Sequence, residues 1–238
     1  MKRLLFAMIS STMISSTLLA MLPVAPASAD VIGTTSHGRP VVATFQGDPA
    51  ATRVIVVIGQ MHGNEPGGRG VVDALRARTL PVGTGLWTIK SLNPDGAVKH
   101  SRVNGRGVDL NRNFPDRWRA HMSTNPGQHP ASEPETQAVM RFLQQVKPQL
   151  VISYHQAYNV VDTAMPRARP LARAYAHRVG MRTERVPCMG PCRGTMIGWL
   201  TRSTAIDGFT VELPSHVSAD MVRRHARAVL SGFGELGN

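Results

Sequence analysis

The sequence predicts an α/β fold built on a parallel β-sheet, and three neighbouring features lead to this class. Residues 54–58 are five consecutive β-branched apolar residues inside a predicted strand at Arg53–Ile58, as is typical of a strand buried on both faces. The run Gly67–Arg78 carries apolar residues at helical spacing, so a helix follows. His62 and Glu65 lie between them, just beyond the carboxyl end of the strand, where open α/β sheets bind their ligands.

Residues 1–29 have the pattern of a signal peptide. Lys2 and Arg3 form a positive start, Leu4–Leu22 is largely apolar, and residues 27–29 give the small-x-small pattern of a cleavage site. We therefore expect cleavage before Asp30 and a location that is secreted, periplasmic or associated with the cell wall. A retained membrane anchor is the alternative, but interspersed serines make the apolar segment more polar.

Removal of this segment leaves residues 30–238, which are 209 of the 238 residues and enough for a single domain with a sizeable core. No later stretch approaches the ~20 apolar residues of a transmembrane helix, so no membrane partner is expected after signal removal. No internal repeat or second domain is visible, and we expect a monomer.

The chain is strongly basic. Its formal net charge of +12 falls to +10 when Lys2 and Arg3 leave, and such a charge attracts polyanions. Nucleic acid is not an expected partner, because no binding motif is present and aromatic residues, at 5%, are few for base stacking. Anionic wall polymers or carboxylate-rich substrates fit an exported protein better. The alternative is that the arginine excess, 23 of 27 basic residues, reflects coding composition and no partner.

Before and after the central strand, two further strands are expected, at Val41–Phe45 and Leu86–Leu92. The second strand runs into Asn93-Pro94-Asp95-Gly96, which predicts a turn. A long irregular stretch, Ala97–Pro130, then follows. Because a loop of this length in a compact domain is usually functional or disordered, its density of Asn, Arg and Asp favours a function.

The second half of the chain alternates helices and strands. Ser132 is expected to cap a helix, with Glu135 completing a capping box. The remaining expected elements are a strand at Leu150–Ser153 that leads into His155, a helix over residues 168–180, a short helix at Thr195–Leu200, a final strand at Ile206–Leu213 that carries Glu212, and a closing helix capped by Ser218.

Cys188 and Cys192 are the only cysteines. In an oxidising compartment we expect them to form a disulfide that closes a tight loop. A metal site would need more soft ligands nearby. A redox pair is the other alternative, although the spacing is not Cys-x-x-Cys.

Four polar residues at strand ends suggest a metal-dependent reaction. Two imidazoles and one carboxylate are the ligand set of a hydrolytic zinc site, and we assign His62, Glu65 and His155 to one Zn²⁺ ion. Zinc lowers the pKa of a bound water toward neutrality, and a separate carboxylate then moves its proton. Glu212 is the candidate for that role, because it lies on a different strand.

Each of these residues also has a purely structural alternative. His62 and Glu65 would cap the next helix, His155 would be a hydrogen-bonded core histidine, and Glu212 would sit in a structural ion pair. Glu212 lies between two apolar residues of its strand, and burying a carboxylate without a partner is costly. It therefore needs either an arginine or a metal-bound water beside it.

The long loop supplies candidate cations. Hydrolysis of an amide places negative charge on the carbonyl oxygen, which Arg102 or Arg112 could stabilise. A guanidinium also binds a carboxylate through two hydrogen bonds, and Asn111 would add an amide donor. The alternative for any one of these arginines is a solvated surface charge.

Together these residues resemble the zinc carboxypeptidase (funnelin) family over about residues 50–215. The motifs that carry the resemblance, in this order, are His62-x-x-Glu65, Asn93-Pro94-Asp95-Gly96, Arg102, Asn111-Arg112-Asn113-Phe114, His155 and Glu212. Within the family, the segments 102–115 and 132–136 are most similar to murein peptide amidases. Those enzymes cut the bond between γ-D-glutamate and meso-diaminopimelate in peptidoglycan stem peptides.

The resemblance implies a three-layer α/β/α fold with a mixed, mostly parallel sheet and the site at its carboxyl edge. It implies zinc binding by His62, Glu65 and His155, with Glu212 as the catalytic carboxylate. Arg102 would polarise the scissile carbonyl. Two further residues, Asn111 and Arg112, would hold the terminal carboxylate of a peptide substrate.

One departure from the family is clear. Larger digestive relatives have a mobile tyrosine about twenty residues before the catalytic glutamate, whereas residues 188–194 contain none. Substrate preference therefore cannot be copied from those relatives. We expect Trp199 and residues 194–198 to line a specificity pocket, with a plain core helix as the alternative.

Three functions compete at this stage. The first is an exported zinc peptidase or amidase that acts on cell-wall stem peptides. The second is an N-acyl amino acid deacylase similar to succinylglutamate desuccinylase and aspartoacylase, but the Asn93–Gly96 motif and the export pattern disfavour it. The third is a basic wall-binding protein without activity, which ranks last because every catalytic position is filled.

Overall fold

The computed structural model describes residues 28–186 and 192–236 of the chain. Its strands are β1 (Ser28–Thr34), β2 (Pro40–Gly47), β3 (Arg53–Ile58), β4 (Thr84–Ile89), β5 (Leu150–Asp162), β6 (Arg182–Glu184) and β7 (Asp207–Pro214). Its helices are α1 (Gly67–Arg76), α2 (Pro94–Lys99), the 3-10 turn η1 (Leu110–Arg112), α3 (Pro134–Val146), α4 (Arg169–Val179), α5 (Met196–Ser203) and α6 (Ala219–Gly232).

The strands form one mixed sheet of seven strands. Its order is β1-β2-β4-β3-β5-β6, with β7 also paired to β5. The pairs β1–β2 and β2–β4 are antiparallel, and the pairs β4–β3, β3–β5, β5–β6 and β5–β7 are parallel. The expected mixed, mostly parallel sheet is therefore confirmed.

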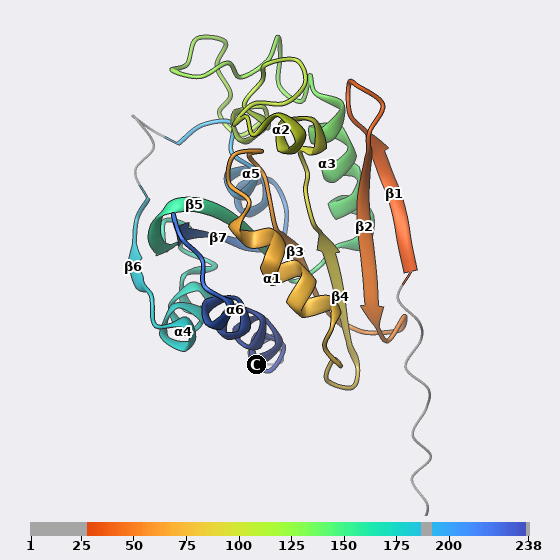
Figure 1. Cartoon of the computed structure of the whole chain (residues 1–238), viewed down its shortest axis with the longest axis vertical. Helices are drawn as coiled ribbons and strands as arrows, with labels where there is room; N and C mark the ends of the chain where they lie inside the picture. Colours follow the sequence, from red (N-terminus) through yellow and green to blue (C-terminus); the bar gives the residue numbers. More distant parts are fainter. Residues whose placement is uncertain (1–27, 187–191, 237–238) are drawn as a thin grey trace, which may run out of the picture.

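Helices cover both faces of the sheet and make three layers. One apolar cluster packs α1, α4 and α6 on one face, and a second packs α3 and α5 on the other, so apolar side chains cover β3 and β5 from both sides. Figure 1 shows α1, α4 and α6 in front of the sheet and α5 behind it. This burial on both faces explains why residues 54–58 are apolar without alternation.

Strand β5 is long because it passes β7 twice. Its first part places His155 opposite Glu212; after register shifts between Ala157 and Val160, Val160 lies opposite the same Glu212. The sequence-based expectation that the strand ends at Ser153, with His155 beyond it, was wrong. His155 lies within the strand, next to the bend.

The other predicted strands and helices are confirmed within a few residues. They correspond to β2, β3, β4 and β7 and to α1, α3, α4, α5 and α6. Strands β1 and β6 were not predicted, because their residues are mostly exposed and show no apolar alternation. Ser218 caps α6 as expected, since its side chain accepts a hydrogen bond from Met221 N.

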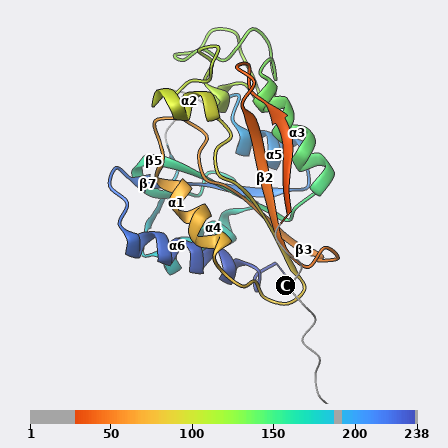
Figure 2. The same cartoon turned by 45° about the vertical axis from the view of Figure 1, so that its right-hand side comes forward.

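The predicted turn at Asn93–Gly96 is instead the first turn of α2. Asn93 Oδ1 accepts a hydrogen bond from Gly96 N at 2.8 Å, which is the role of an N-cap. The irregular stretch Ala97–Pro130 accordingly begins with the end of α2 and contains η1. Figures 1 and 2 both place the segment between α2 and α3 at one end of the molecule.

The predicted cap of α3 was also wrong. The N-cap is Glu133, without a side-chain cap hydrogen bond. Ser132 Oγ instead donates to Glu133 Oε1 at 2.7 Å and accepts from Asn113 Nδ2 at 2.9 Å. Glu135 is buried and accepts from Asn104 Nδ2 at 3.2 Å. Ser132 and Glu135, which the predicted capping box would have used, are therefore hydrogen bonded to the long loop instead.

The predicted signal peptide lies outside the described residues except for its last two. Strand β1 begins at Ser28, two residues before the predicted cleavage point, and the cleavage stays a prediction. Within residues 28–186 and 192–236, no helix combines the length and the apolar character needed to cross a bilayer.

Candidate metal centre

The loop of residues 59–66 joins β3 to α1 and carries His62 and Glu65. It packs so tightly on the start of α2 that a Cβ atom on Gly63 would lie 1.9 Å from the carbonyl carbon of Gly96. Only glycine fits at such a contact. Gln60 Nε2 also donates to Gly63 O at 2.9 Å. The start of α2 and this hydrogen bond therefore hold the loop that presents the two polar side chains.

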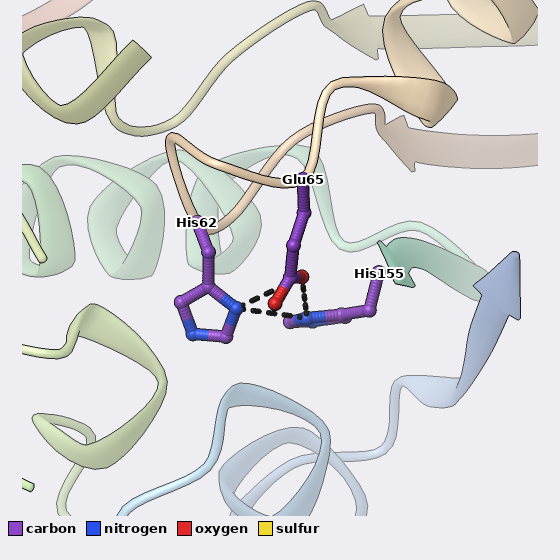
Figure 3. Close-up of side chains that lie close together, drawn as sticks. All are labelled: His62, Glu65 and His155. Carbon is purple, nitrogen blue, oxygen red and sulfur yellow. Dashed lines mark hydrogen bonds and ion pairs between the residues drawn. The ribbon is translucent and has the colours of Figure 1, made fainter. Parts of the chain in front are cut away.

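Three predicted ligands converge at the carboxyl edge of the sheet (Figure 3). His62 Nδ1 and His155 Nδ1 each lie 3.0 Å from Glu65 Oε2, and the two nitrogens lie 3.2 Å apart. All three side chains are buried. The chain thus brings together residues from the loop after β3 and from β5, 90 or more positions apart in sequence.

This set of atoms fits zinc. A tetrahedral ion with bonds of ~2.0–2.1 Å places its ligand atoms about 3.3 Å apart, close to the separations of 3.0, 3.0 and 3.2 Å found here. Two imidazoles and one carboxylate are also the protein ligands of hydrolytic zinc sites. Among the described residues, no other group of His, Cys, Asp or Glu is arranged to hold a metal ion.

The surroundings keep Glu65 ionised. Burial alone would raise the pKa of its carboxyl, but hydrogen bonds from His155 and His62 hold that pKa well below its ordinary value. Burial likewise opposes a charge on His62, whereas hydrogen bonds to Asp109 and Glu65 raise the pKa of that histidine. The pocket is therefore built to receive positive charge.

Asp109 supports the centre and was not predicted as a functional residue. It is fully buried at the start of η1, and its Oδ1 accepts from His62 Nε2 at 3.0 Å. Because this carboxylate can only accept, Nε2 of His62 carries a proton, so Nδ1, which faces Glu65 and His155, is the nitrogen that would bind a metal. The burial argument used for Glu212 would have found it, since Asp109 also lies between two apolar residues, Val108 and Leu110.

Arg102 joins the metal ligands to Asp109. Its Nη1 donates to Glu65 Oε1 at 3.1 Å, and its Nε donates to Asp109 Oδ2 at 3.0 Å. Its Nη2 makes no hydrogen bond with any described residue. Arg102 is therefore fixed in orientation and still presents a donor to the cleft that it lines.

Glu212 lies where the sequence placed it, beside the metal ligands. It is opposite His155 in the β5–β7 register, and it is buried at 7% exposure. Its Oε2 is buried without a partner among the described residues. Burial raises the pKa of Glu212, while the charges of His155 and Arg102 act in the other direction. An unpartnered buried carboxylate oxygen beside a metal centre is suited to exchange a proton with a bound substrate or water.

Asn111 and Arg112 lie on η1 and line the same cleft. Asn111 Oδ1 accepts from Met196 N at 3.0 Å, so the amide is tied to the start of α5. Arg112 Nη1 donates to Asn111 O at 2.7 Å, and burial lowers the pKa of its guanidinium. Arg112 forms no ion pair within the described residues, so its guanidinium can bind a carboxylate of a ligand.

The metal centre opens into a cleft of about 1170 Å³. Seven arginines line it, against three carboxylates. The arginines are Arg102, Arg112, Arg117, Arg119, Arg185, Arg193 and Arg202, and the carboxylates are Glu65, Asp162 and Glu212. A cleft with this excess of positive charge favours substrates that carry several carboxylates.

Of the residues expected to line a specificity pocket, only some line the cleft. Thr195 and Ile197 line the cleft, but Trp199 is a core residue stacked on Phe114 with ring centres 5.9 Å apart. Cys192 also lines the cleft, whereas Cys188 lies outside the described residues. The disulfide between them stays a prediction.

Comparison with known proteins agrees with this geometry. The family model described as zinc carboxypeptidase matches residues 26–222. The chain is 28% identical to murein peptide amidase A of Escherichia coli (strain K12) over 149 residues, which are 55% of this chain and 62% of the relative. It is 30% identical to carboxypeptidase SOL1 of Arabidopsis thaliana over 132 residues, 49% of this chain and 26% of that protein.

Solved structures share the fold. The murein-tripeptide amidase MpaA from Escherichia coli O157 superposes with a TM-score of 0.71 and 24% identity, covering 90% of this chain and 93% of the other. A carboxypeptidase A from Helicoverpa armigera gives a TM-score of 0.71 at 16% identity, covering 87% of this chain and 67% of that one. The expected three-layer architecture is thus that of known carboxypeptidases.

Proposed function

Because the chain belongs to the zinc carboxypeptidase family, we propose that it is an exported zinc-dependent hydrolase of cell-wall peptides. It cuts the amide bond to a C-terminal residue, and its preferred bond joins γ-D-glutamate to meso-diaminopimelate. One observation carries this proposal: His62, Glu65 and His155 form a zinc-type ligand set directly beside the buried, unpartnered Oε2 of Glu212.

Two further observations support the choice of substrate. The relatives include proteins named murein peptide amidase A, although the aligned region spans only 62% of the Escherichia coli relative. The arginine-rich cleft suits a stem peptide, because γ-linkage leaves the α-carboxylate of D-glutamate free and diaminopimelate adds two more carboxylates.

Bound zinc supplies a Lewis acid that lowers the barrier to water attack on the amide. Glu212 takes a proton from the attacking water at its Oε2 as the oxygen of that water bonds to the carbonyl carbon. The free Nη2 of Arg102 donates to the carbonyl oxygen, where negative charge develops. The C–N bond then breaks, and Glu212 delivers its proton to the leaving amine nitrogen, so proton and charge balance across the cycle.

Asn111 and Arg112 orient the substrate in this scheme. The guanidinium of Arg112 binds the terminal carboxylate, and Asn111 adds an amide donor beside it. Since Asn111 is tied to α5 through Met196 N, the position of the carboxylate is fixed relative to the wall of the cleft. Correct placement of the peptide bond against Glu212 follows from this anchor.

The first test is substitution of the proposed base. Glu212→Gln keeps the size of the side chain but cannot take a proton, so we expect zinc content to stay the same and kcat on L-Ala-γ-D-Glu-meso-diaminopimelate to fall at least ~100-fold. Zinc is measured by elemental analysis and turnover by release of diaminopimelate. Glu235→Gln, which alters a peripheral pair with Arg178, is the matched control. Unchanged turnover in Glu212→Gln would show that another group moves the proton.

The same assay separates the competing functions. A conventional C-terminal peptide and an N-acyl amino acid are offered beside the stem peptide. Faster turnover of the N-acyl amino acid would favour a deacylase. Neither bound zinc nor turnover of any substrate would favour a wall-binding protein. Export is tested separately by the mass of the protein recovered outside the cytoplasm, where we expect a chain that begins at Asp30.

A further inference from the structure

Strands β5 and β7 carry two rows of side chains on the face of the sheet that is turned toward the cleft. In one row His155 lies opposite Glu212, which in turn lies opposite Val160 on the second part of β5. Two residues earlier on β7, Thr210 lies opposite Ser153. Side chains two residues apart on a strand share a face, so this second row, with Thr210, lies beside the row that contains Glu212. The two rows are about 6.8 Å apart.

Asp162 belongs to the second row. Val161 lies opposite Val211, and continuing that register by one residue brings Asp162 beside Thr210. Val161 and Val211 belong to the apolar cluster under α1, α4 and α6, so their neighbours Asp162 and Thr210 face the other side of the sheet. Both Asp162 and Thr210 line the cleft, as this alternation requires.

Hydrogen bonds to one oxygen of Asp162 hold its carboxylate in place, and the other oxygen has no partner among the described residues. Its Oδ1 accepts from Ala164 N at 2.8 Å and from Val186 N at 3.2 Å. Its Oδ2 bonds to no described residue, and no ion pair joins it to Arg185, whose charge is nearby. Burial raises the pKa of Asp162, because an ionised carboxylate is less stable away from water, and a cationic partner would offset that free-energy cost. Asp162 is also the one carboxylate of the cleft that the proposed reaction does not use.

We propose that Asp162 binds an ammonium group at the end of the side chain of the substrate's C-terminal residue. This inference rests on the proposed function and sharpens it, because it makes the cleft selective for a diamino acid. With its four carbon–carbon bonds and final carbon–nitrogen bond extended, such a side chain places its nitrogen about 6 Å from its Cα atom, close to the step of about 6.8 Å between the row of Glu212 and the row of Asp162.

The neighbouring cations suit a zwitterionic side-chain end. Arg202 is fixed by a bidentate ion pair with Asp116, and its Nη1 lies 3.6 Å from Met165 Sδ in the wall of the cleft. Arg185 lines the same cleft next to Val186. Because the charge of Arg185 acts on Asp162, an ammonium bound there would have a guanidinium nearby that can bind a carboxylate on the same carbon, as in meso-diaminopimelate.

The test compares two peptides that differ in one charge. L-Ala-γ-D-Glu-L-Lys and L-Ala-γ-D-Glu-L-norleucine are assayed with the zinc-loaded protein and with Asp162→Asn. We expect the native protein to prefer the lysine peptide in kcat/KM. Asp162→Asn should lose about 10- to 100-fold in kcat/KM on the lysine peptide, mainly through KM, and nothing on the norleucine peptide. The control Glu184→Gln, on the exposed strand β6 and outside the cleft lining, should change neither value.

Equal losses on both peptides, or no preference in the native protein, would overturn the role of Asp162. If Asp162→Asn does not fold, Asp162→Glu serves instead. It keeps the charge on a longer side chain and should favour a C-terminal ornithine over lysine; an unshifted preference would count against the proposal.

A binding measurement separates this inference from the proposed function. Free L-lysine and L-norleucine are titrated by calorimetry into zinc-loaded Glu212→Gln, with and without Asp162→Asn. If the native protein hydrolyses no peptide, the proposed function fails. A preference for lysine that disappears with Asp162→Asn would still support the ammonium site, and equal binding of the two amino acids would refute it.

Discussion

At the scale of single residues, the centre depends on side chains that never touch the substrate. Asp109 fixes the proton of His62 on Nε2 and holds Arg102 through a second oxygen, so one carboxylate orients both a metal ligand and a cation. Such outer partners determine which ring nitrogen of a histidine can bind the metal. The orientation of His62, a proposed zinc ligand, is therefore fixed by Asp109, which is not one of the proposed ligands.

Substitution of Asp109 tests this dependence. In Asp109→Asn the amide presents a donor nitrogen in place of one acceptor oxygen, so either His62 or Arg102 loses its partner. We expect the zinc dissociation constant to rise about 10- to 100-fold, measured by competition with a chelator. Asp73→Asn, which removes an exposed carboxylate paired with Lys90, is the control and should keep the native affinity. An unchanged zinc affinity in Asp109→Asn would mean that the loop alone orients His62.

At the scale of secondary structure, the site depends on how separate elements are joined. Gln156 follows His155 in β5, and its Oε1 accepts from Gly67 N at 2.7 Å at the start of α1. Its Nε2 donates to Pro214 O at 2.9 Å at the end of β7. One side chain thus connects the loop that carries Glu65 with the strand that carries the proposed base.

We expect Gln156→Glu to uncouple these elements. The new carboxylate can still accept from Gly67 N, but it cannot donate to Pro214 O and faces that carbonyl with like charge. Because small displacements of a base are costly, kcat should fall about 10- to 100-fold while zinc content stays native. Steady-state kinetics and elemental analysis measure both. Gln137→Glu changes a comparable hydrogen bond on the exposed face of α3 and should be neutral. Loss of zinc in Gln156→Glu would instead point to a role in ligand binding.

The elements that carry the site could largely be predicted from the sequence. The apolar run before His62 and the apolar neighbours of Glu212 mark buried strands, and patterns of this kind depend only on which faces are covered. The bend in β5 could not be predicted, because the second part of the strand is defined by pairing with β7 and β6, which are distant in sequence. Asp162 was missed for the same reason, since only the bend brings it to the cleft.

Local chemistry misled the prediction where tertiary contacts compete for the same side chain. Ser132 and Glu135 have the spacing of a capping box, but Asn113 and Asn104 from the long loop take them as partners. The loop thereby gains buried hydrogen bonds that a solvent-exposed cap would not provide. In the Asn93–Gly96 motif the residues expected to form a turn begin a helix instead. Pro94 is the first residue of α2, and Asn93 is its N-cap.

At the scale of the whole molecule, a buried polar chain links two helices to the sheet. Tyr154 on β5 and Tyr175 on α4 are hydrogen bonded through their hydroxyls at 2.5 Å, and Tyr175 is bonded to His225 Nδ1 on α6 at 2.7 Å. His225 is fully buried, and its Nε2 has no partner among the described residues. Burial lowers the pKa of His225 to about 4. The folded protein therefore keeps this imidazole neutral under conditions in which an unfolded chain would protonate it.

The consequence is a loss of stability in mild acid that depends on this one residue. The pKa of His225 is about 4 when folded and ~6.5 when unfolded, so the unfolded state takes up the extra proton as pH falls between these values. The contribution of the neutral His225 ring to the free energy of unfolding is complete above pH ~6.5 and is lost toward pH ~4, by up to about 3 kcal/mol.

His225→Gln keeps an acceptor for Tyr175 without a titrating ring. In urea unfolding, the free energy of unfolding of His225→Gln, relative to that of the native chain, should rise as pH falls from ~7 to ~4.5. For the control His177→Gln, at an exposed position, the difference from the native chain should not change with pH. Zinc release affects all three chains alike and cancels in these differences, so a flat profile for His225→Gln would show that the buried imidazole accepts a proton without penalty.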